Sequence, residues 1–188
     1  MIKTNIFFTL ISLLFLNLNA HADELDKLFF RLKNAENFSK AVKLEKKIWK
    51  IWTTNGSNKN SNLQMYKGIN FINNGNINNA LKVFLNLCKV EPNWAEPFNK
   101  VATIKFLQKD YITSIKYIKL TLEKERRHFG AISGLAQINL RLGKFENALK
   151  NINQAIKIHP FIGIKKIKPL LLEKLKKKEI NLYLSHIN

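Results

Sequence analysis

A repeat of 34 residues is the feature that most restricts how this chain can fold. Each position of the repeat keeps its own chemistry from copy to copy. One small position holds Ala80, Ser114 and Ala148, and another holds Gly68, Ala102 and Ala136. A bulky apolar position holds Phe84, Ile118 and Ile152. A fixed period with a fixed residue type at each position predicts a stack of equal units that bury their apolar faces against one another.

Each copy of the repeat predicts two helices joined by a tight turn. In the first copy, apolar residues recur at helical spacing from Ile77 to Cys88, after a turn at Gly75. Gly75 and Gly143 suit the left-handed backbone that ends a helix, because glycine has no Cβ to clash. Lys109 holds the same position in the second copy and suits it less well. The small residues let two helix axes approach closely, so we expect a helical hairpin in each copy.

The period and its positions resemble the tetratricopeptide repeat (TPR), whose pattern has set places for aromatic, small and proline residues. The matching residues are Gly68, Phe71, Ala80, Phe84 and Pro92, then Phe98, Val101, Ala102, Tyr111 and Ser114, then Leu135, Ala136, Phe145, Ala148 and Pro160. The resemblance covers about half of the chain. It implies an all-α fold, a TPR-like solenoid of helical hairpins wound into a right-handed superhelix.

The pattern and its interruptions divide the chain into seven segments. We expect a cleaved signal peptide, an N-terminal helical hairpin cap, three TPR-like repeats, a C-terminal capping helix and a loose tail, over residues 1–22, 23–56, 61–94, 95–128, 129–162, 163–180 and 181–188. Pro169 is awkward inside a helix. Either the capping helix kinks there, or its regular part starts near Lys168 with Pro169 in the first turn.

The first 22 residues have the pattern of a secretory signal peptide. Lys3 precedes an apolar run from Ile6 to Leu18, and Ala20-His21-Ala22 offers small residues for cleavage after Ala22. The run is shorter than the roughly 20 apolar residues that span a membrane. We therefore expect an exported, periplasmic protein. Cys88 is the single cysteine of the sequence, so no internal disulfide can form.

The N-terminal segment extends the resemblance. Three stretches resemble a group of exported TPR proteins from alphaproteobacteria. They are Asp23 to Phe29, the helix that carries Trp49 and Trp52, and Arg127-His128-Phe129-Gly130-Ala131. That group has no agreed biochemical role. We expect Trp49 and Trp52 to pack the N-terminal cap against the repeats.

The net charge of +19 admits several kinds of partner. The lysines are spread along most of the predicted helices, with no arginine-rich stripe and no surface that would stack bases. We therefore expect no nucleic-acid partner and interpret the lysines as solvated helix faces. Peripheral membrane contact through the lysine-rich C-terminal helix and self-assembly of copies into a structural solenoid stay open as alternatives.

The sequence offers no constellation for catalysis. Four histidines, one of them in the signal peptide, show no metal-ligand spacing, and no serine lies in a nucleophile elbow. No glycine-rich loop is placed to hold phosphate. Capping or solvation suffices to explain Glu91 and Glu96. We expect neither enzymatic activity nor a metal or other cofactor.

The expected activity is therefore binding of another protein. In a TPR-like array the first helix of each hairpin lines a concave face. The resemblance implies these groove positions: Asn62, Met65, Ile69 and Asn73 in the first repeat, Asn99, Thr103 and Phe106 in the second, and Ser133, Gln137 and Arg141 in the third. Amides would bond a peptide backbone, Ile69 and Phe106 would anchor apolar side chains, and Arg141 would meet a carboxylate. We expect a periplasmic adaptor or scaffold that binds a peptide or helix of another cell-envelope protein through this face.

Overall fold

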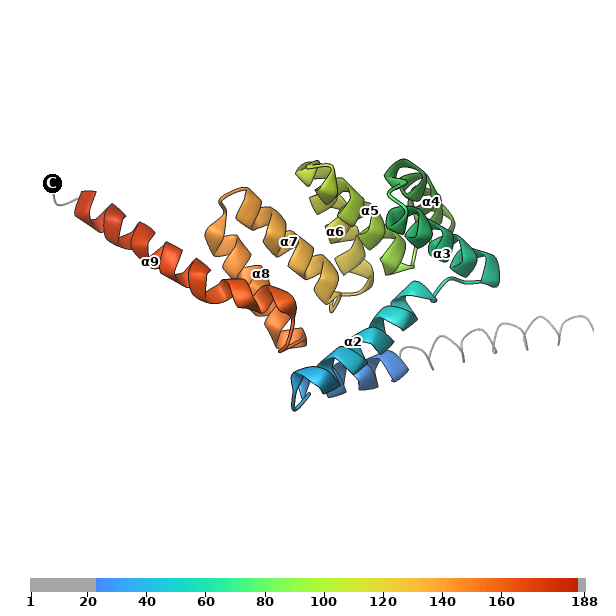
Figure 1. Cartoon of the computed structure of the whole chain (residues 1–188), viewed down its shortest axis with the longest axis horizontal. Helices are drawn as coiled ribbons and strands as arrows, with labels where there is room; N and C mark the ends of the chain where they lie inside the picture. Colours follow the sequence, from blue (N-terminus) through green and yellow to red (C-terminus); the bar gives the residue numbers. More distant parts are fainter. Residues whose placement is uncertain (1–22, 186–188) are drawn as a thin grey trace, which may run out of the picture. The chain divides into compact units, whose positions relative to one another are not determined.

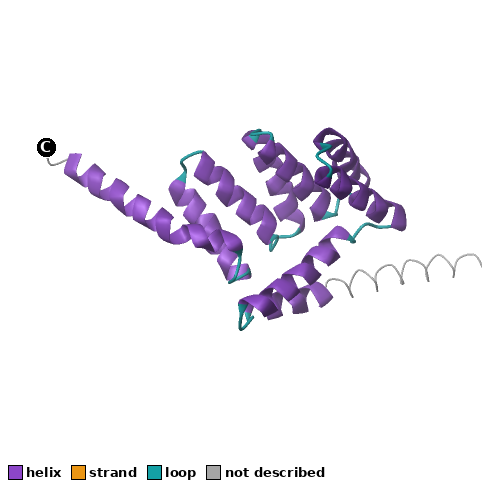
Figure 2. Ribbon diagram, viewed as in Figure 1, coloured by secondary structure: helices purple, strands orange, loops and turns teal. Residues whose placement is uncertain are grey.

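The computed structural model describes residues 23–185. The predicted signal peptide and its cleavage site lie outside the described residues. Within the described part the chain is helical and has no strand (Figure 2). Contacts divide the chain at Ile51 and Trp52 into two compact units.

The first unit contains a helical hairpin. Residues 23–33 are helical, and α2 runs over Phe38–Thr53, so its last residues belong to the second unit. One face of each helix is apolar and buried: Leu28, Phe29 and Leu32 on the first, and Ala41, Leu44 and Ile48 on α2. Their spacing of three and four residues is the spacing of one helical face.

Three helical hairpins of nearly equal length form most of the second unit and follow one another in chain order (Figure 1). Their helices are α3 (Lys59–Asn73) and α4 (Ile77–Val90), α5 (Ala95–Leu107) and α6 (Tyr111–Lys124), and α7 (Phe129–Arg141) and α8 (Phe145–Ile158). The second helices start 34 residues apart, as the sequence period requires.

Each hairpin turns at a residue with left-handed backbone. Gly75, Lys109 and Gly143 have φ angles of 74°, 61° and 69°. In the first two hairpins the residue after the turn caps the second helix: the Asn76 side chain accepts the Asn79 N–H at 3.4 Å, and the Asp110 side chain accepts the Thr113 N–H at 3.1 Å. The second turn has the same backbone conformation with a lysine at the position where the other two copies have glycine.

The small positions of the repeat lie where the two helices of a hairpin touch. Ala80, Ser114 and Ala148 have no exposed surface. A serine is tolerated in this apolar place because its hydroxyl donates a hydrogen bond to the Ala102 carbonyl at 2.8 Å. The buried apolar residues of successive hairpins form clusters that continue through the unit.

The C-terminal segment confirms one of the two arrangements predicted around Pro169, the helix that starts near Lys168, and differs from the prediction at the tail. A 3₁₀ turn, η1 (Gly163–Ile167), precedes α9 (Lys168–Ser185), so Pro169 lies in the first turn of α9, where its missing N–H costs nothing. The predicted tail from residue 181 is wrong as far as Ser185. No glycine or proline follows Pro169, so nothing in the sequence stops the helix.

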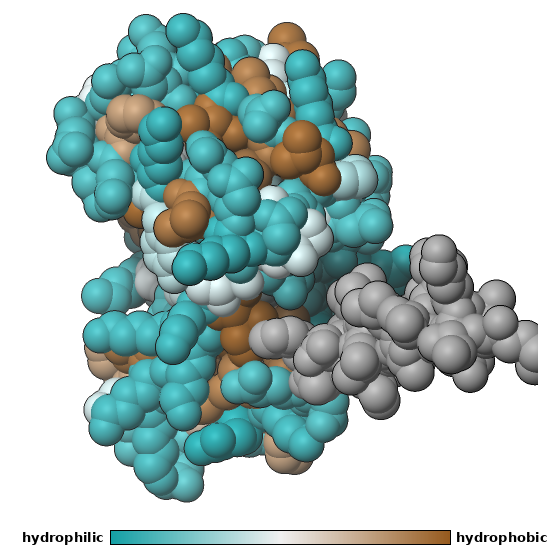
Figure 3. Space-filling model, turned by 90° about the vertical axis from the view of Figure 1, so that its right-hand side faces the viewer, coloured by the Kyte–Doolittle hydropathy of each residue, from teal (hydrophilic) through white to brown (hydrophobic). Residues whose placement is uncertain are grey.

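The surface agrees with the interpretation of the lysines as solvated side chains. The face in Figure 3 is largely hydrophilic, with separate hydrophobic patches. None of the helices within residues 23–185 combines the length and the apolar character that a membrane span needs.

Candidate functional site

A cavity of about 280 Å³ opens between the first helices of the second and third hairpins. Its lining comes from α5, α6 and α7: Asn99, Ala102, Thr103, Phe106 and Leu107, then Ser114 and Ile118, then Gly130, Ala131, Gly134 and Gln137. We call this cavity the α5–α7 groove. It lies on the face that the repeat pattern predicts for binding.

Two glycines open the α7 wall of the groove. Gly130 and Gly134 are one helical turn apart, and both line the cavity. A Cβ on Gly134 would meet the Ile118 Cδ1 at 3.5 Å, which is ordinary contact. Glu96 and Lys100 hold the equivalent repeat positions on α5. The space therefore exists because α7 has no side chains where α5 has long ones.

The lining combines apolar residues with uncharged polar groups. Phe106 is half-buried and packs near Tyr111, with ring centroids 5.8 Å apart. Thr103 and Gln137 are exposed, and the Thr103 hydroxyl donates to the Asn99 carbonyl at 2.9 Å. No charged residue lines the groove. This is unusual for a chain of net charge +19, and it favours an uncharged, apolar ligand group.

The groove contains four of the ten predicted binding residues. These are Asn99, Thr103 and Phe106 on α5 and Gln137 on α7. Ser133 and Arg141 lie on α7 outside its lining, and the first-repeat residues Asn62, Ile69 and Asn73 lie on α3.

Met65 is a correction to the predicted set, because its side chain has no exposed surface. It packs in the apolar cluster that contains Phe84, Leu87 and Trp94. A methionine of the core cannot contact a ligand on the concave face.

Sequence reasoning missed the residues that shape the groove. Leu107, Gly130 and Gly134 line it, and none was among the predicted binding residues. A signal for the two glycines was present, since the repeat places larger residues at the equivalent positions of α5.

A buried polar cluster lies beside the α5–α7 groove. Glu96 and His128 have no exposed surface, and the His128 Nε2 lies 2.9 Å from a carboxylate oxygen of Glu96. The His128 Nδ1 accepts the Ala131 N–H at 3.1 Å and so caps α7. The proton of a neutral ring is therefore on Nε2, where it donates to Glu96. Asn99 of the groove donates to the same carboxylate oxygen at 3.2 Å.

Burial and charge act in opposite directions on Glu96. Burial alone would raise the pKa of this carboxyl, but the Lys100 ammonium at 2.8 Å and the His128 hydrogen bond outweigh it and hold the pKa below its usual range. The Trp52 ring stacks on the His128 ring, with centroids 4.0 Å apart. The burial and pairing of Glu96 correct the expectation that solvation or capping explains this residue. The ring stacking places Trp52 against the start of α7.

Metal binding finds no support in the described structure. Among residues 23–185, no three His, Cys, Asp or Glu side chains gather closely enough to hold an ion.

The stacked hairpins and the groove on their first helices define a helical-repeat solenoid. No family model matches the sequence. The sequence is 32% identical, over 136 residues, to a TPR repeat-containing protein of Rhizobium etli, and the match covers 72% of this chain and 66% of that relative. The chain thus spans about two thirds of the relative's length. The chain belongs to the tetratricopeptide-repeat family.

Solved structures show the same fold at low identity. The first TPR of Spaghetti (RPAP3), bound to the HSP90 peptide SRMEEVD, matches with a TM-score of 0.60 at 16% identity and covers 64% of this chain and 97% of its own. The Sgt2 TPR domain of Aspergillus fumigatus matches at 0.59 and 11% identity, over 66% of this chain and 84% of its own. MamA matches at 0.52 and 14% identity, over 85% of this chain and 90% of its own.

Proposed function

We propose that this chain is a non-enzymatic scaffold that binds a peptide segment of another protein in the α5–α7 groove. The observation that carries the proposal is the uncharged lining of this groove in a strongly basic chain. An apolar lining with a few polar groups is the usual composition of a recognition site.

The groove suits an extended segment with one apolar anchor residue. Its volume of about 280 Å³ is below that of most pockets for drug-sized ligands, so it accommodates a side chain rather than a helix. The anchor packs against Phe106, Leu107 and Ile118. The Gln137 amide and the Thr103 hydroxyl bond the peptide backbone beside it.

The RPAP3 domain supports peptide binding by this fold, since that domain was solved with the HSP90 peptide SRMEEVD. The groove of this chain has no lysine or arginine in its lining. We therefore expect its peptide to be selected by the apolar anchor and not by a carboxylate.

The proposed compartment is the periplasm, and the proposed partner is another cell-envelope protein. Both rest on the signal-peptide pattern of residues 1–22. A modest groove of this kind predicts micromolar affinity.

A peptide library displayed on phage tests the proposal. The mature chain should enrich peptides that share one large apolar residue. Gly134→Leu fills the groove from its α7 wall, and Phe106→Ala with Gln137→Ala removes one aromatic contact of the peptide's anchor residue and one polar group of the lining. Each should weaken binding of the enriched peptide at least tenfold and leave the circular dichroism spectrum unchanged.

The matched control is Arg141→Ala, a change on the same helix outside the lining of the groove. It should leave binding unchanged. Equal binding by wild type and by Gly134→Leu would remove the α5–α7 groove as the site.

A further inference from the structure

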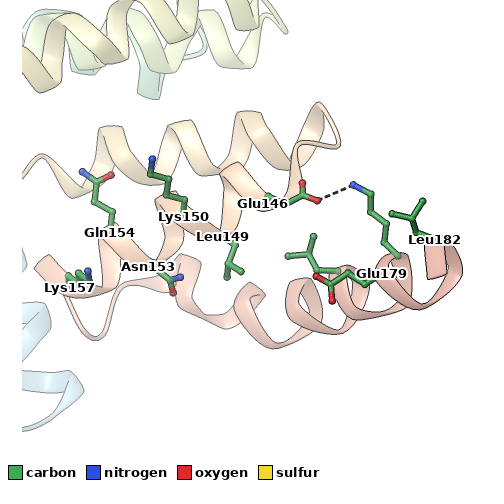
Figure 4. Close-up of a pocket in the computed structure, with 10 residues that line it drawn as sticks. Glu146, Leu149, Lys150, Asn153, Gln154, Lys157, Glu179 and Leu182 are labelled. Atoms are coloured by element: carbon green, nitrogen blue, oxygen red, sulfur yellow. Dashed lines mark hydrogen bonds and ion pairs between the residues drawn. The ribbon is translucent and has the colours of Figure 1, made fainter.

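A second, larger cavity lies between the last two helices, on residues that the α5–α7 groove does not use. It has a volume of about 840 Å³, and we call it the α8–α9 groove. Its lining consists of Glu146, Leu149, Lys150, Asn153, Gln154 and Lys157 from α8 and Leu175, Lys178, Glu179 and Leu182 from α9 (Figure 4).

The groove exists because α9 continues as a helix past the position at which α3, α5 and α7 each end in a turn. The three turns have their left-handed residue at Gly75, Lys109 and Gly143. The next position in the period is Lys177, which lies inside α9, and the helix continues to Ser185. Within the described residues, the distal half of α9 thus lacks the antiparallel second helix that α3, α5 and α7 each have.

The α8 wall has an equivalent on α6, one repeat earlier in the chain. Shifted by one period, its six lining positions are Ile112, Ile115, Lys116, Lys119, Leu120 and Glu123, and these line a hollow of about 420 Å³ on α6. On α6 the lining comes from that helix alone. On α8 the distal half of α9 supplies a second wall, and the hollow becomes a groove.

A solvent-exposed ion pair joins the two walls. The Lys178 Nζ donates to a Glu146 carboxylate oxygen at 2.9 Å, from the distal part of α9 to the first turn of α8 (Figure 4). The two side chains are 63% and 62% exposed, so the pair links the walls only weakly.

The lining has a pattern that matches one face of a helix. Leu149 and Leu175 are half-buried and Leu182 is 60% exposed, so an apolar strip is available. Lys150 and Lys157 are exposed on α8 and lie seven residues apart, and Leu175 and Leu182 on α9 are also separated by seven residues. Seven residues are two helical turns, and the α8 wall spans about 16 Å, or three turns.

We propose that the α8–α9 groove binds an acidic amphipathic helix of a partner protein. The helix takes the place of the missing second helix, with apolar residues at i, i+3 and i+7 against the leucines and carboxylates opposite Lys150 and Lys157. Charge complementarity supports this occupant on the α8 wall, where Lys150 and Lys157 line the groove and Glu146 is paired with Lys178. Glu179 on the α9 wall requires an uncharged side chain opposite it.

The charges disfavour two other occupants. A second copy of α9 would bring lysines against lysines. An anionic membrane needs basic residues that are available on one face. Lys174, Lys177 and Lys178 share a face of α9, but each already has a partner in the chain: the Phe145 ring at 4.2 Å, Glu173 at 2.8 Å and Glu146 at 2.9 Å.

Fluorescence anisotropy with a designed probe tests the proposal on the full mature chain. The probe is a labelled 18-residue helix with leucines at i, i+3 and i+7 flanked by glutamates, and its matched control has lysines in place of the glutamates. We expect the acidic probe to bind with a micromolar Kd and the basic probe not to bind.

Two variants locate the site and one serves as control. Lys150→Glu with Lys157→Glu, and separately Leu182→Asp, should each weaken binding at least tenfold. All three positions are exposed, so the fold should tolerate the changes. Lys116→Glu with Lys119→Glu changes the charge equally on α6 and should weaken binding less than twofold. Gly134→Leu, which blocks the α5–α7 groove, should have no effect.

Three results would overturn the proposal. The first is no saturable binding up to 100 times the expected Kd, or an equal loss in the α6 control. The second is association with phosphatidylglycerol vesicles that Lys150→Glu with Lys157→Glu abolishes, which would assign the groove to lipid. The third is a dimer in light scattering that Leu182→Asp dissociates, which would assign it to a second copy.

Discussion

The Cβ that Gly68 lacks would stand 2.5 Å from two carbons of the Phe84 ring. These two residues face each other across the first hairpin, and Phe84 has no exposed surface. In the second hairpin the same two positions hold Ala102 and Ile118. The bulkier residue on the second helix is thus matched by the smaller residue on the first.

Gly68→Ala should therefore destabilise the protein, although alanine normally stabilises a helix. The methyl group overpacks the core and should lower the free energy of unfolding by about 1–3 kcal/mol. Phe84→Ile alone should lower it through the cavity it leaves. The double variant reproduces the alanine–isoleucine pair and should recover most of both losses, which urea denaturation measures. Additive losses in the double variant would contradict the direct contact.

Gly134→Ala should have the opposite sign from Gly68→Ala. A Cβ there meets the Ile118 Cδ1 at an ordinary 3.5 Å, so the higher helix propensity of alanine should raise the free energy of unfolding by about 0.5–1 kcal/mol. Urea denaturation of this variant beside Gly68→Ala separates packing from propensity. A loss of stability would mean that α7 has no room at the groove.

Ala148→Leu should overpack the third hairpin, because Ala148 has no exposed surface between its two helices. We expect the free energy of unfolding to fall by about 1–3 kcal/mol. Asn147→Leu is the control, because Asn147 precedes Ala148 on the same helix and is exposed. Thermal melts followed by circular dichroism that give equal midpoints for the two variants would count against the packing described.

Glu96 should make the protein sensitive to acid. Its folded pKa lies below the ordinary value of 4.5, so the unfolded state binds the proton more readily than the native state. The stability that Glu96 contributes is complete above pH 4.5 and is lost as the pH falls through the folded pKa.

Glu96→Gln tests this contribution. It breaks a buried pair and should cost about 3 kcal/mol at pH 7. Denaturation between pH 6 and 3 should also show a shallower decline in the variant than in wild type. Glu123→Gln, at an exposed position of α6, is the control. Parallel pH profiles for wild type and Glu96→Gln would exclude Glu96 as the sensitive group.

The 34-residue period predicts the hairpins because each repeated residue type answers a local need, such as the left-handed turn at Gly75 or the close approach at Ala80. The distal end of α9 was missed, since Leu182, Tyr183 and Leu184 are consecutive in the sequence and show no helical period. The Glu96–His128 pair was missed for another reason. It joins residues 32 apart that meet only after the hairpins stack, and no local pattern marks such a contact.

The binding residues were predicted only in part for a similar reason. The period identifies the first helices but not which of their positions stay open. Met65 shows this, because it lies on the expected helix and yet belongs to the core. The groove arises where Gly130 and Gly134 leave space, which is a property of two neighbouring helices together.

Cys88 should react slowly with thiol reagents in the folded protein. Burial raises its pKa to about 12, so the reactive thiolate is scarce at pH 8. Labelling with a disulfide reagent should be at least about tenfold slower in buffer than in denaturant. Equal rates in the two solutions would mean that α4 opens readily around this residue.

The central claim is that the α5–α7 groove holds a segment of another protein, and photo-crosslinking in intact cells tests it most directly. One variant carries the photoreactive residue at Phe106 in the groove, and the control carries it at Lys116, exposed on α6. The account predicts that mass spectrometry finds one envelope protein crosslinked at Phe106, lost with Gly134→Leu and absent at Lys116. No crosslink at Phe106, or the same products at both positions, would contradict it.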